Sequence, residues 1–310
     1  MFRAMGEFEL ISRFVRCFDV LESPRGPGDD CAVVPPAKHA TCVTTDAIVE
    51  GVHFSRLAPS RASRLARGRA AFEDIGHKAL AVNLSDLAAM GARAEWFTVA
   101  LALPRRVRDA DVIKLGRGMS KLARVHGARL IGGNVTRARE LSITITASGV
   151  LEAKPLLRTG ARIGDRIFVS GTLGDAAGGL LRGAPRELVR AQCRPTPHLG
   201  FVRRARKMIS AAIDVSDGLL QDLGHLHVGA ELDSAAIPLS RALVKFVGAR
   251  RALELALRGG EDYVLLFTAP DRHAAALRAL GAFEIGQVTR RSGVRVDGKA
   301  ITGRRGFTHR

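Results

Sequence analysis

One aspartate inside an apolar helix places the strongest constraint on how this chain folds. Apolar residues recur at helical spacing from Ile75 to Met90, and Gly91 follows as a typical C-terminal cap. Asp86 lies within this stretch, among mostly apolar neighbours. A carboxylate in such a place is costly unless it is paired or binds a cation. The fold must therefore bring a cation or a polar group to this helix.

Other aspartates stand beside short segments that have the composition of strands. These segments are rich in β-branched and apolar residues and are bounded by Pro, Gly or Asp, as at 41–45 and 211–215. The aspartates beside them are Asp29, Asp30, Asp46, Asp214 and Asp217. Carboxylates are hard oxygen ligands that suit Mg²⁺, which proteins commonly share with substrate phosphates. Together with Asp86, the set predicts a phosphoryl-transfer site.

Each of these motifs also has a structural interpretation. Asp-Gly is a common turn, Thr44-Thr45-Asp46 fits a strand end with a cap, and Asp29-Asp30 fits a solvated loop. The glycine motifs of P-loop and dinucleotide-binding folds are absent from the sequence, as are the His-Arg-Asp and Asp-Phe-Gly motifs of protein kinases. The common phosphate-handling folds are therefore not indicated.

The length and composition favour a globular protein of one large or two medium domains. The 310 residues are 46% hydrophobic, and no run reaches the roughly eighteen apolar residues of a membrane span. The N-terminus has no long apolar signal core. The four cysteines, Cys17, Cys31, Cys42 and Cys193, contain no Cys-x-x-Cys pair, which predicts buried thiols in a reducing cytoplasm and no structural zinc.

A net charge of +18 raises the question of an anionic partner. Arginine outnumbers lysine forty to eight and is spread along the whole chain, with one dense patch from Arg56 to Arg69. A single tyrosine and a single tryptophan leave no aromatic platform for single-stranded nucleic acid. The charge is therefore interpreted as a compositional bias, no nucleic-acid partner is expected, and the patch is interpreted as a solvated loop.

The order of expected elements indicates two α+β halves that meet near residue 150. In the first half we expect an amphipathic helix from Phe8 that ends near residue 23, strands at 31–34, 41–45, 96–103 and 141–150, and helices at 75–90 and 109–126. A strand at 128–131 is expected to run into a loop at Gly132-Gly133-Asn134. In the second half we expect helices from 175, at 198–210 and at 218–228, and strands at 167–169, 211–215 and 263–269. The predicted domains are residues 1–150 and 151–310.

Five longer motifs follow one another along the chain. They are Gly28–Val34, Thr44–Phe54, Lys78–Ala92, Ala212–Leu219 and Gly259–Tyr263. In content and order they resemble thiamine-monophosphate kinases, and the resemblance covers about residues 6 to 307. Within the aminoimidazole-ribonucleotide-synthetase-like superfamily, two strings together are specific to this family: Val-Glu-Gly-Val-His-Phe at 49–54 and Asn-Leu-Ser-Asp-Leu-Ala-Ala-Met-Gly at 83–91.

The resemblance implies transfer of the γ-phosphoryl group of ATP to the phosphate of thiamine monophosphate, which gives thiamine diphosphate. It implies an α/β (α+β) fold of two domains, in which residues 1–150 bind metal and ATP and their sheet forms a barrel across a homodimer. Residues 151–310 would form a C-terminal α+β domain that completes the active site. Mg²⁺ would be the cofactor, and ATP the co-substrate.

The resemblance also implies roles for residues at matching positions. The Mg²⁺ ligands would be Asp30, Thr44, Thr45, Asp46, Asp86, Asn134, Asp214 and Asp217, of which Asp46 and Asp214 would be catalytic. ATP would contact Gly133, Asn134, Arg158 and Ser216. Thiamine monophosphate would contact His53, Glu261 and Phe307.

Structural roles remain open for several of these residues. His53 fits a packed strand-end histidine, Glu261 a turn residue and Phe307 C-terminal packing. Arg158 is one of forty arginines. At Asn134 the family usually has an aspartate, so an amide replaces one negative charge but keeps an oxygen donor. The rival functions are another ATP-using enzyme of the superfamily and a non-catalytic nucleic-acid or regulatory binding protein that kept the fold.

Overall fold

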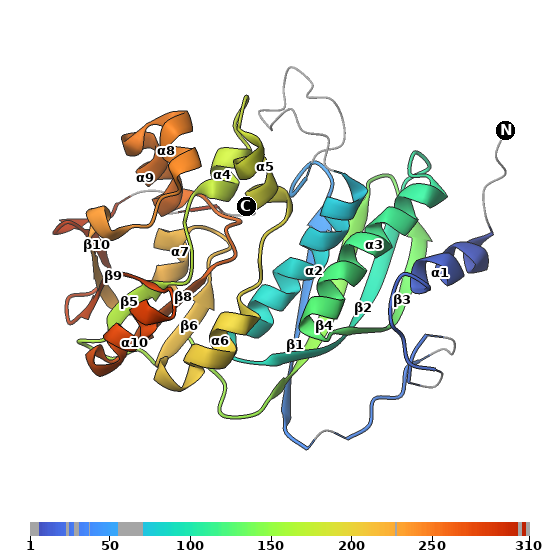
Figure 1. Cartoon of the computed structure of the whole chain (residues 1–310), viewed down its shortest axis with the longest axis horizontal. Coiled ribbons are helices and arrows are strands. Elements are labelled where there is room, and N and C mark those ends of the chain that lie inside the picture. Colours follow the sequence, from blue (N-terminus) through green and yellow to red (C-terminus); the bar gives the residue numbers. More distant parts are fainter. Residues whose placement is uncertain are drawn as a thin grey trace. The chain divides into compact units, whose positions relative to one another are not determined.

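The computed structural model of the chain describes residues 6–22, 25–27, 31–36, 38–54, 71–226, 228–302 and 306–307. It contains two compact units: the first comprises the described residues up to 87 and residues 92–152, and the second comprises residues 88–91 and the described residues from 153 onward. Each unit has its own sheet and helices (Figure 1). The mixed α/β fold expected from the sequence is therefore confirmed. Within the described ranges, no helix has the length and apolar character needed to cross a membrane.

A four-stranded sheet forms the centre of the first unit. In spatial order its strands are β1 (Ala40–Val49), β4 (Ser142–Leu151), β2 (Arg93–Leu103) and β3 (Arg129–Arg137). β4 runs antiparallel to β1 and β2, whereas β2 and β3 are parallel. Helices α2 (Phe72–Ala89) and α3 (Asp109–His126) lie along this sheet, and α1 (Glu7–Val15) lies beside α3 and β3 (Figure 1). β1 and β3 are therefore the outer strands.

Alternating side chains divide this sheet into a covered face and an open face. On β4, Ile143 and Ile145 are fully buried, whereas Thr144 between them is only half-buried. Asp46 of β1 pairs with Ile145, and Thr45 pairs with the next residue of β4. Because paired residues share a face, Asp46 belongs to the covered face and Thr45 to the open one.

A seven-stranded sheet forms the centre of the second unit. In spatial order its strands are β11 (Lys299–Ala300), β10 (Val294–Val296), β7 (Gly229–Leu232), β9 (Phe283–Thr289), β5 (Arg166–Val169), β8 (Leu265–Ala269) and β6 (Ala211–Asp214). The α-helices are α4 (Asp175–Gly179), α5 (Arg186–Cys193), α6 (Leu199–Ala205), α7 (Leu219–Gly224), α8 (Arg241–Val247), α9 (Ala249–Arg258) and α10 (Ala274–Ala279). Short 3₁₀ turns occur at Arg206–Met208, Ser234–Ala236 and Asp271–His273.

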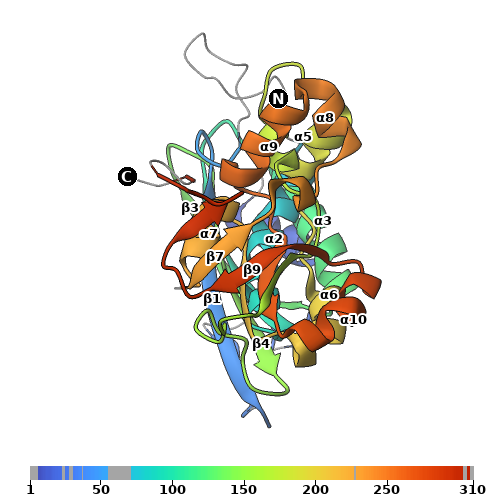
Figure 2. The same ribbon diagram turned by 90° about the vertical axis from the view of Figure 1, so that its left-hand side faces the viewer.

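Side chains from both faces of this second sheet are packed in cores. The rings of Phe168 and Phe267 stack with centroids 5.4 Å apart, in a cluster with residues of α6 and α10, which lie close together in Figure 2. Ile167 and Ile213 belong to a separate cluster with Leu219 of α7. Because successive side chains of a strand point to opposite faces, the apolar residues of β5 contribute to both cores: Ile167 to one and Phe168 to the other. The packing holds β6, and the loop after it, in place.

Several predicted elements differ from the structure. The strand expected at 41–45 continues past Asp46 to Val49 as β1, so Asp46 lies within a strand and not at its end. The first helix ends at Val15 rather than near residue 23, because the following backbone N–H groups form tighter i→i−3 bonds. Residues 31–34 form no strand, since the two prolines that follow them offer no N–H to a ladder. The strand expected to end at Ile131 continues as β3 to Arg137. Gly132–Asn134 therefore belong to a strand and not to a loop.

Candidate active site

A hydrogen-bonded group of oxygen donors joins β1 to α2 in the first unit. The Thr44 hydroxyl donates to Asp86 Oδ2 at 2.6 Å, and the Asp46 backbone N–H donates to Asn83 Oδ1 at 3.1 Å. Asn83 is fully buried and lies three residues before Asp86, so the two side chains share one side of α2. Thr44 therefore supplies a polar partner of the kind that Asp86 requires.

The chemistry of these donors fits a Mg²⁺ site. The hydroxyl of Thr44 and the carboxylates of Asp46 and Asp86 are hard oxygen ligands on the covered face of the sheet. Thr45 is directed to the other face, where its hydroxyl donates to Ile145 O at 3.1 Å. In the part of the chain that the structure describes, no three His, Cys, Asp or Glu side chains gather as one metal-binding cluster. The candidate Mg²⁺ ligands of the first unit are thus a hydroxyl group together with carboxylates.

The turn after β1 carries His53. Its Nδ1 accepts the Val49 backbone N–H at 3.1 Å, so the neutral ring carries its proton on Nε2. Lys78, which is buried, donates from Nζ to the His53 carbonyl at 3.2 Å. The buried Glu50 forms an ion pair with Arg106, with Oε2 and Nη2 2.8 Å apart. The turn is therefore held on both sides of its chain, and a neutral His53 presents an N–H donor.

A cavity of about 470 Å³ lies between α1 and strands β2 and β3. Gly133 and Asn134 line it together with apolar side chains that include Ile11, Phe14 and Leu130. Mostly apolar cavities with a few polar groups are the usual form of small-molecule sites, and a nucleotide base fits in this volume. Two residues that the family resemblance assigns to ATP therefore border a cavity suited to a base.

Asn134 does not lie with the donors at α2. Strands β4 and β2 separate β3 from β1, which amounts to about 14 Å along the sheet at the usual strand spacing. Asp46 aligns across the sheet with Gly133, one residue before Asn134, so the side chains of Asp46 and Asn134 project from different faces. Any oxygen that Asn134 supplies belongs to a separate set of donors.

In the second unit, β6 ends at Asp214 and leads into a loop that a buried carboxyl group holds. Asp222 of α7 is 2% exposed, and its Oδ2 accepts the backbone N–H groups of Asp217 and Gly218, both at 3.0 Å. Burial raises the pKa of Asp222 to about 7. This carboxyl group therefore fixes the loop that carries Ser216 and Asp217.

The raised pKa of Asp222 predicts a pH-dependent contribution to stability. The unfolded chain releases this proton near pH 3.8, but the folded protein keeps it up to about pH 7, so ionisation destabilises the fold increasingly across that window. In Asp222→Asn the amide oxygen still accepts both N–H groups and nothing ionises. Between pH 5 and 8 we expect the variant to gain about 2–3 kcal/mol in unfolding free energy relative to wild type, measured with urea. A difference independent of pH would refute the raised pKa.

The segment from Glu261 to Tyr263 lies against the same loop. The Glu261 N–H donates to Ser216 O and the Tyr263 N–H donates to Val215 O, both at 2.8 Å. Glu261 and Tyr263 have φ angles of 68° and 51°, which are uncommon for residues other than glycine and concentrate at functional sites. Asp262 between them accepts two backbone N–H groups at the start of α4, at 2.7 and 3.1 Å. These bonds hold Glu261 in its uncommon conformation.

Residues that are distant in sequence meet at this loop. The Phe307 backbone N–H donates to Asp217 O at 2.9 Å, and Gln192 of α5 donates to Glu261 Oε2 at 3.4 Å. The structure therefore brings together, along one loop and the segments bonded to it, the predicted site residues Asp214, Ser216, Asp217, Glu261 and Phe307.

Other predicted site features have different positions. Arg158 is exposed, and the carbonyl of the preceding Leu157 accepts the Ala212 N–H at 3.3 Å, so this segment runs beside β6. Asp30, a predicted Mg²⁺ ligand, lies outside the described residues. The arginine patch at 56–69 also lies outside them.

Three polar residues that hold the candidate site received no role from the sequence. Asn83, Asp222 and Gln192 are all buried. A buried polar group is costly without hydrogen bonds, so a lone polar residue on the apolar side of a helix is a usable signal. Asn83 and Asp222 carry that signal, whereas Gln192 lies in a helix with many polar residues and does not.

Comparisons with known proteins indicate one family. Residues 28–151 match the family model of AIR synthase related protein, N-terminal domain. Thiamine-monophosphate kinase of Salmonella typhimurium is 40% identical over 296 residues, covering 88% of this chain and 86% of that protein. The same enzyme of Aquifex aeolicus is 34% identical and covers 96% of both chains.

Solved structures lead to the same group. The crystal structure of thiamine-monophosphate kinase from Stenotrophomonas maltophilia has a TM-score of 0.82 and 39% identity, covering 96% of this chain and 99% of that chain. AaThiL complexed with AMPPCP and TMP has a TM-score of 0.78 and 32% identity, covering 100% and 99%. Residues 28–151 therefore form a domain of the AIR synthase-related class. Within that class, the chain belongs to the thiamine-monophosphate kinase family, as the motifs predict.

Proposed function

We propose that this chain transfers the γ-phosphoryl group of ATP to the phosphate of thiamine monophosphate and so forms thiamine diphosphate. The observation that carries the proposal is the meeting of Asp217, Glu261 and Phe307 at one loop of a family member. The related AaThiL holds AMPPCP, an analogue of ATP, together with TMP, which supports the same pair of substrates here. The chain would act as a phosphotransferase in thiamine diphosphate synthesis.

For this reaction the chain mainly has to position the two substrates and neutralise the charge of their phosphates. The acceptor is an ionised phosphate, so no strong general base is required. Holding donor and acceptor in line replaces a bimolecular encounter with an effectively unimolecular step. Fixed groups such as the loop anchored by Asp222 suit this role, because they need no reorganisation during transfer.

We assign Mg²⁺ binding to oxygen donors in each unit. Thr44, Asp46 and Asp86 fit the ion in the first unit, and Asp214 and Asp217 fit it in the second. Thr45, Asp30 and Asn134 remain proposed ligands from the family resemblance. When bound, Mg²⁺ would neutralise phosphate charge and orient the transferred group.

The substrates would meet groups of matching chemistry. His53 offers an N–H donor, Glu261 offers a carboxylate, and Phe307, which is 43% exposed, offers an aromatic ring. A carboxylate and an aromatic face suit the cationic thiazolium and the aminopyrimidine of thiamine. We propose that ATP binds beside Gly133 and Asn134, which line the cavity of the first unit. Arg158 and Ser216 remain proposed ATP contacts from the family resemblance.

An assay of γ-phosphoryl transfer tests the proposed function. Purified protein with Mg²⁺, γ-labelled ATP and thiamine monophosphate is expected to give one labelled thiamine diphosphate for each ADP formed. Transfer to a different acceptor only would favour another enzyme of the superfamily. Absence of any ATP turnover, with binding of nucleic acid, would favour the non-catalytic alternative.

Asn134 gives a prediction about the Mg²⁺ requirement. If its oxygen contacts the cation that accompanies ATP, Asn134→Asp adds a negative charge and strengthens attraction for the ion. We expect the Mg²⁺ concentration at half-maximal rate to fall several-fold, measured by titration at saturating ATP. An unchanged or higher midpoint would remove Asn134 from the proposed metal ligands.

We also propose a homodimer formed through the first unit. β1 and β3 are the outer strands of its sheet, and Val43 on the open face of β1 is 60% exposed. Edge strands favour pairing with another chain, and a barrel across a two-fold axis would cover them. Sedimentation equilibrium is expected to give twice the mass of one chain. A monomer at micromolar concentration in physiological salt would contradict this arrangement.

We propose a cytoplasmic location from the cysteines. None of the four forms a disulfide, in keeping with a reducing compartment. The prediction of buried thiols is wrong, because Cys31 is exposed and Cys17, Cys42 and Cys193 are only half-buried. Cys31 is exposed because its segment forms no strand.

A further inference from the structure

Gln221 of α7 connects two parts of the second unit that have different proposed roles. Its Nε2 donates to Asp217 Oδ2 at 3.2 Å and to the Phe307 carbonyl at 2.7 Å. Asp217 is a proposed Mg²⁺ ligand, and Phe307 is a proposed thiamine contact. One side-chain amide therefore joins the metal-binding loop to the segment that would meet the acceptor.

The backbone completes this connection. The Phe307 N–H donates to Asp217 O at 2.9 Å, and the Phe307 carbonyl accepts from Gln221. Both polar backbone groups of Phe307 are therefore bonded to α7 or to the loop before it. A Cβ at Gly306 would lie 2.5 Å from Asp217 O and 2.8 Å from Gln221 Cβ, so only glycine allows this approach. The segment at 306–307 is thus fixed by direct contact with the loop and with Gln221.

We propose that Gln221 is a positioning residue that couples the metal-binding loop to the acceptor site: it holds the Asp217 carboxylate and the Phe307 backbone in one arrangement, so that Phe307 is placed for thiamine monophosphate. The inference rests on the proposed function, which assigns Asp217 and Phe307 their ligands. Gln221 fits the role because a carboxamide nitrogen has two N–H groups and can serve both acceptors at once. Charge-assisted bonds to a carboxylate are among the stronger hydrogen bonds.

A purely structural role predicts different behaviour. If Gln221 only fastened the chain end to α7, its loss would alter local order while leaving the affinity for thiamine monophosphate unchanged. Coupling predicts that local order at Phe307 and affinity for the acceptor change together. It also predicts that the KM for ATP changes much less than the KM for thiamine monophosphate.

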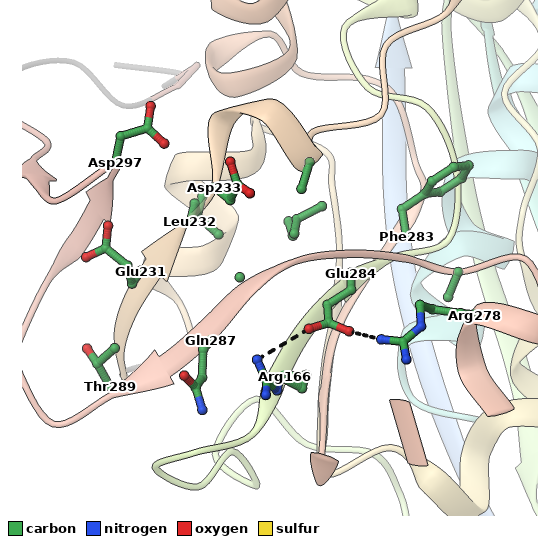
Figure 3. Close-up of a pocket in the computed structure, with 14 residues that line it drawn as sticks. Arg166, Glu231, Leu232, Asp233, Arg278, Phe283, Glu284, Gln287, Thr289 and Asp297 are labelled. Atoms are coloured by element: carbon green, nitrogen blue, oxygen red, sulfur yellow. Dashed lines mark hydrogen bonds and ion pairs between the residues drawn. The ribbon is translucent and has the colours of Figure 1, made fainter. Parts of the chain in front are cut away.

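Gln221→Met tests this, because methionine has a similar length and no N–H donor. We expect amide hydrogen exchange in the C-terminal peptide to become about tenfold faster without ligands, and the Kd for thiamine monophosphate by calorimetry to rise about tenfold. Gln287→Met is the matched control, since the Gln287 side chain donates a hydrogen bond to Gly164 O at 3.2 Å from an exposed position on β9 (Figure 3). The control is expected to change neither quantity.

The outcomes separate the coupling from the proposed function. Faster exchange with an unchanged Kd, or unchanged exchange, overturns the coupling. A wild-type protein that binds no thiamine monophosphate overturns the proposed function instead, and the exchange result still shows whether Gln221 holds Phe307. Gln221→Asn keeps the amide but is too short to serve both oxygens, and it provides the same comparison if the methionine variant does not fold.

Discussion

Asp46→Asn is expected to lower the rate of γ-phosphoryl transfer by about 100-fold or more while leaving the fold intact. The substitution keeps the size of the side chain and removes one negative charge from the donors beside α2. Loss of one such electrostatic group commonly costs two to three orders of magnitude in rate. The fold should survive because the bond from the residue 46 backbone N–H to Asn83 is kept, asparagine has nearly the same shape, and the side chain lies at an exposed position of an outer strand.

The same substitution at two other aspartates makes the result interpretable. Asp214→Asn, at the end of β6, is expected to cause a loss of similar size from the second unit. Asp19→Asn is the control, because Asp19 is 77% exposed and makes a surface ion pair with Arg124, a type of contact worth a few tenths of a kcal/mol. Circular dichroism confirms the fold of each variant. A folded Asp46→Asn protein with a rate within threefold of wild type would remove Asp46 from the catalytic groups.

The carboxylates of the candidate site could be found from the sequence, but most of the groups that hold them could not. Asp46 and Asp214 stand at the ends of apolar segments, and both the apolar run and its bounding residues are local features. The bond from Asp46 N to Asn83 Oδ1 depends on how α2 packs against β1, and the two residues are 37 positions apart. The hydrogen bond from Gln221 to the Phe307 carbonyl likewise joins residues 86 positions apart. Contacts of this kind follow from tertiary packing and leave no periodic signal.

Two predictions are wrong because the composition of a short segment does not show whether a neighbouring strand lies beside it. Residues 31–34 have β-branched composition, but a strand also needs a neighbour to pair with, and the following prolines oppose that. The sequence predicts a loop at Gly132 and Gly133, after a strand at 128–131. In the structure both lie inside β3, and the reason is specific to one of them: at Gly133 the backbone of β2 comes too close for any side chain.

That close approach predicts that Gly133→Ala destabilises the first unit strongly. A Cβ at residue 133 would lie 2.1 Å from Val99 O, well inside van der Waals contact and against backbone that cannot rotate away. The strands would have to separate locally, which breaks ladder bonds between β2 and β3. We expect a loss of about 3 kcal/mol or more in the free energy of unfolding, in the range reached when core packing is overfilled. Urea denaturation followed by circular dichroism measures it.

Comparing Gly132→Ala with Gly133→Ala decides whether close packing against β2 or the approach of a bound nucleotide requires glycine at position 133. At Gly132 the nearest atom to an added Cβ is Thr98 Cγ2 at 3.9 Å, so the methyl group fits without strain. If close packing is the reason for Gly133, Gly133→Ala loses stability with or without ATP and Gly132→Ala does not. If Gly133→Ala instead keeps its stability and only raises the KM for ATP, the glycine serves the approach of phosphate and the packing argument fails. Both glycines border the proposed nucleotide cavity, so the pair separates the two causes within one strand.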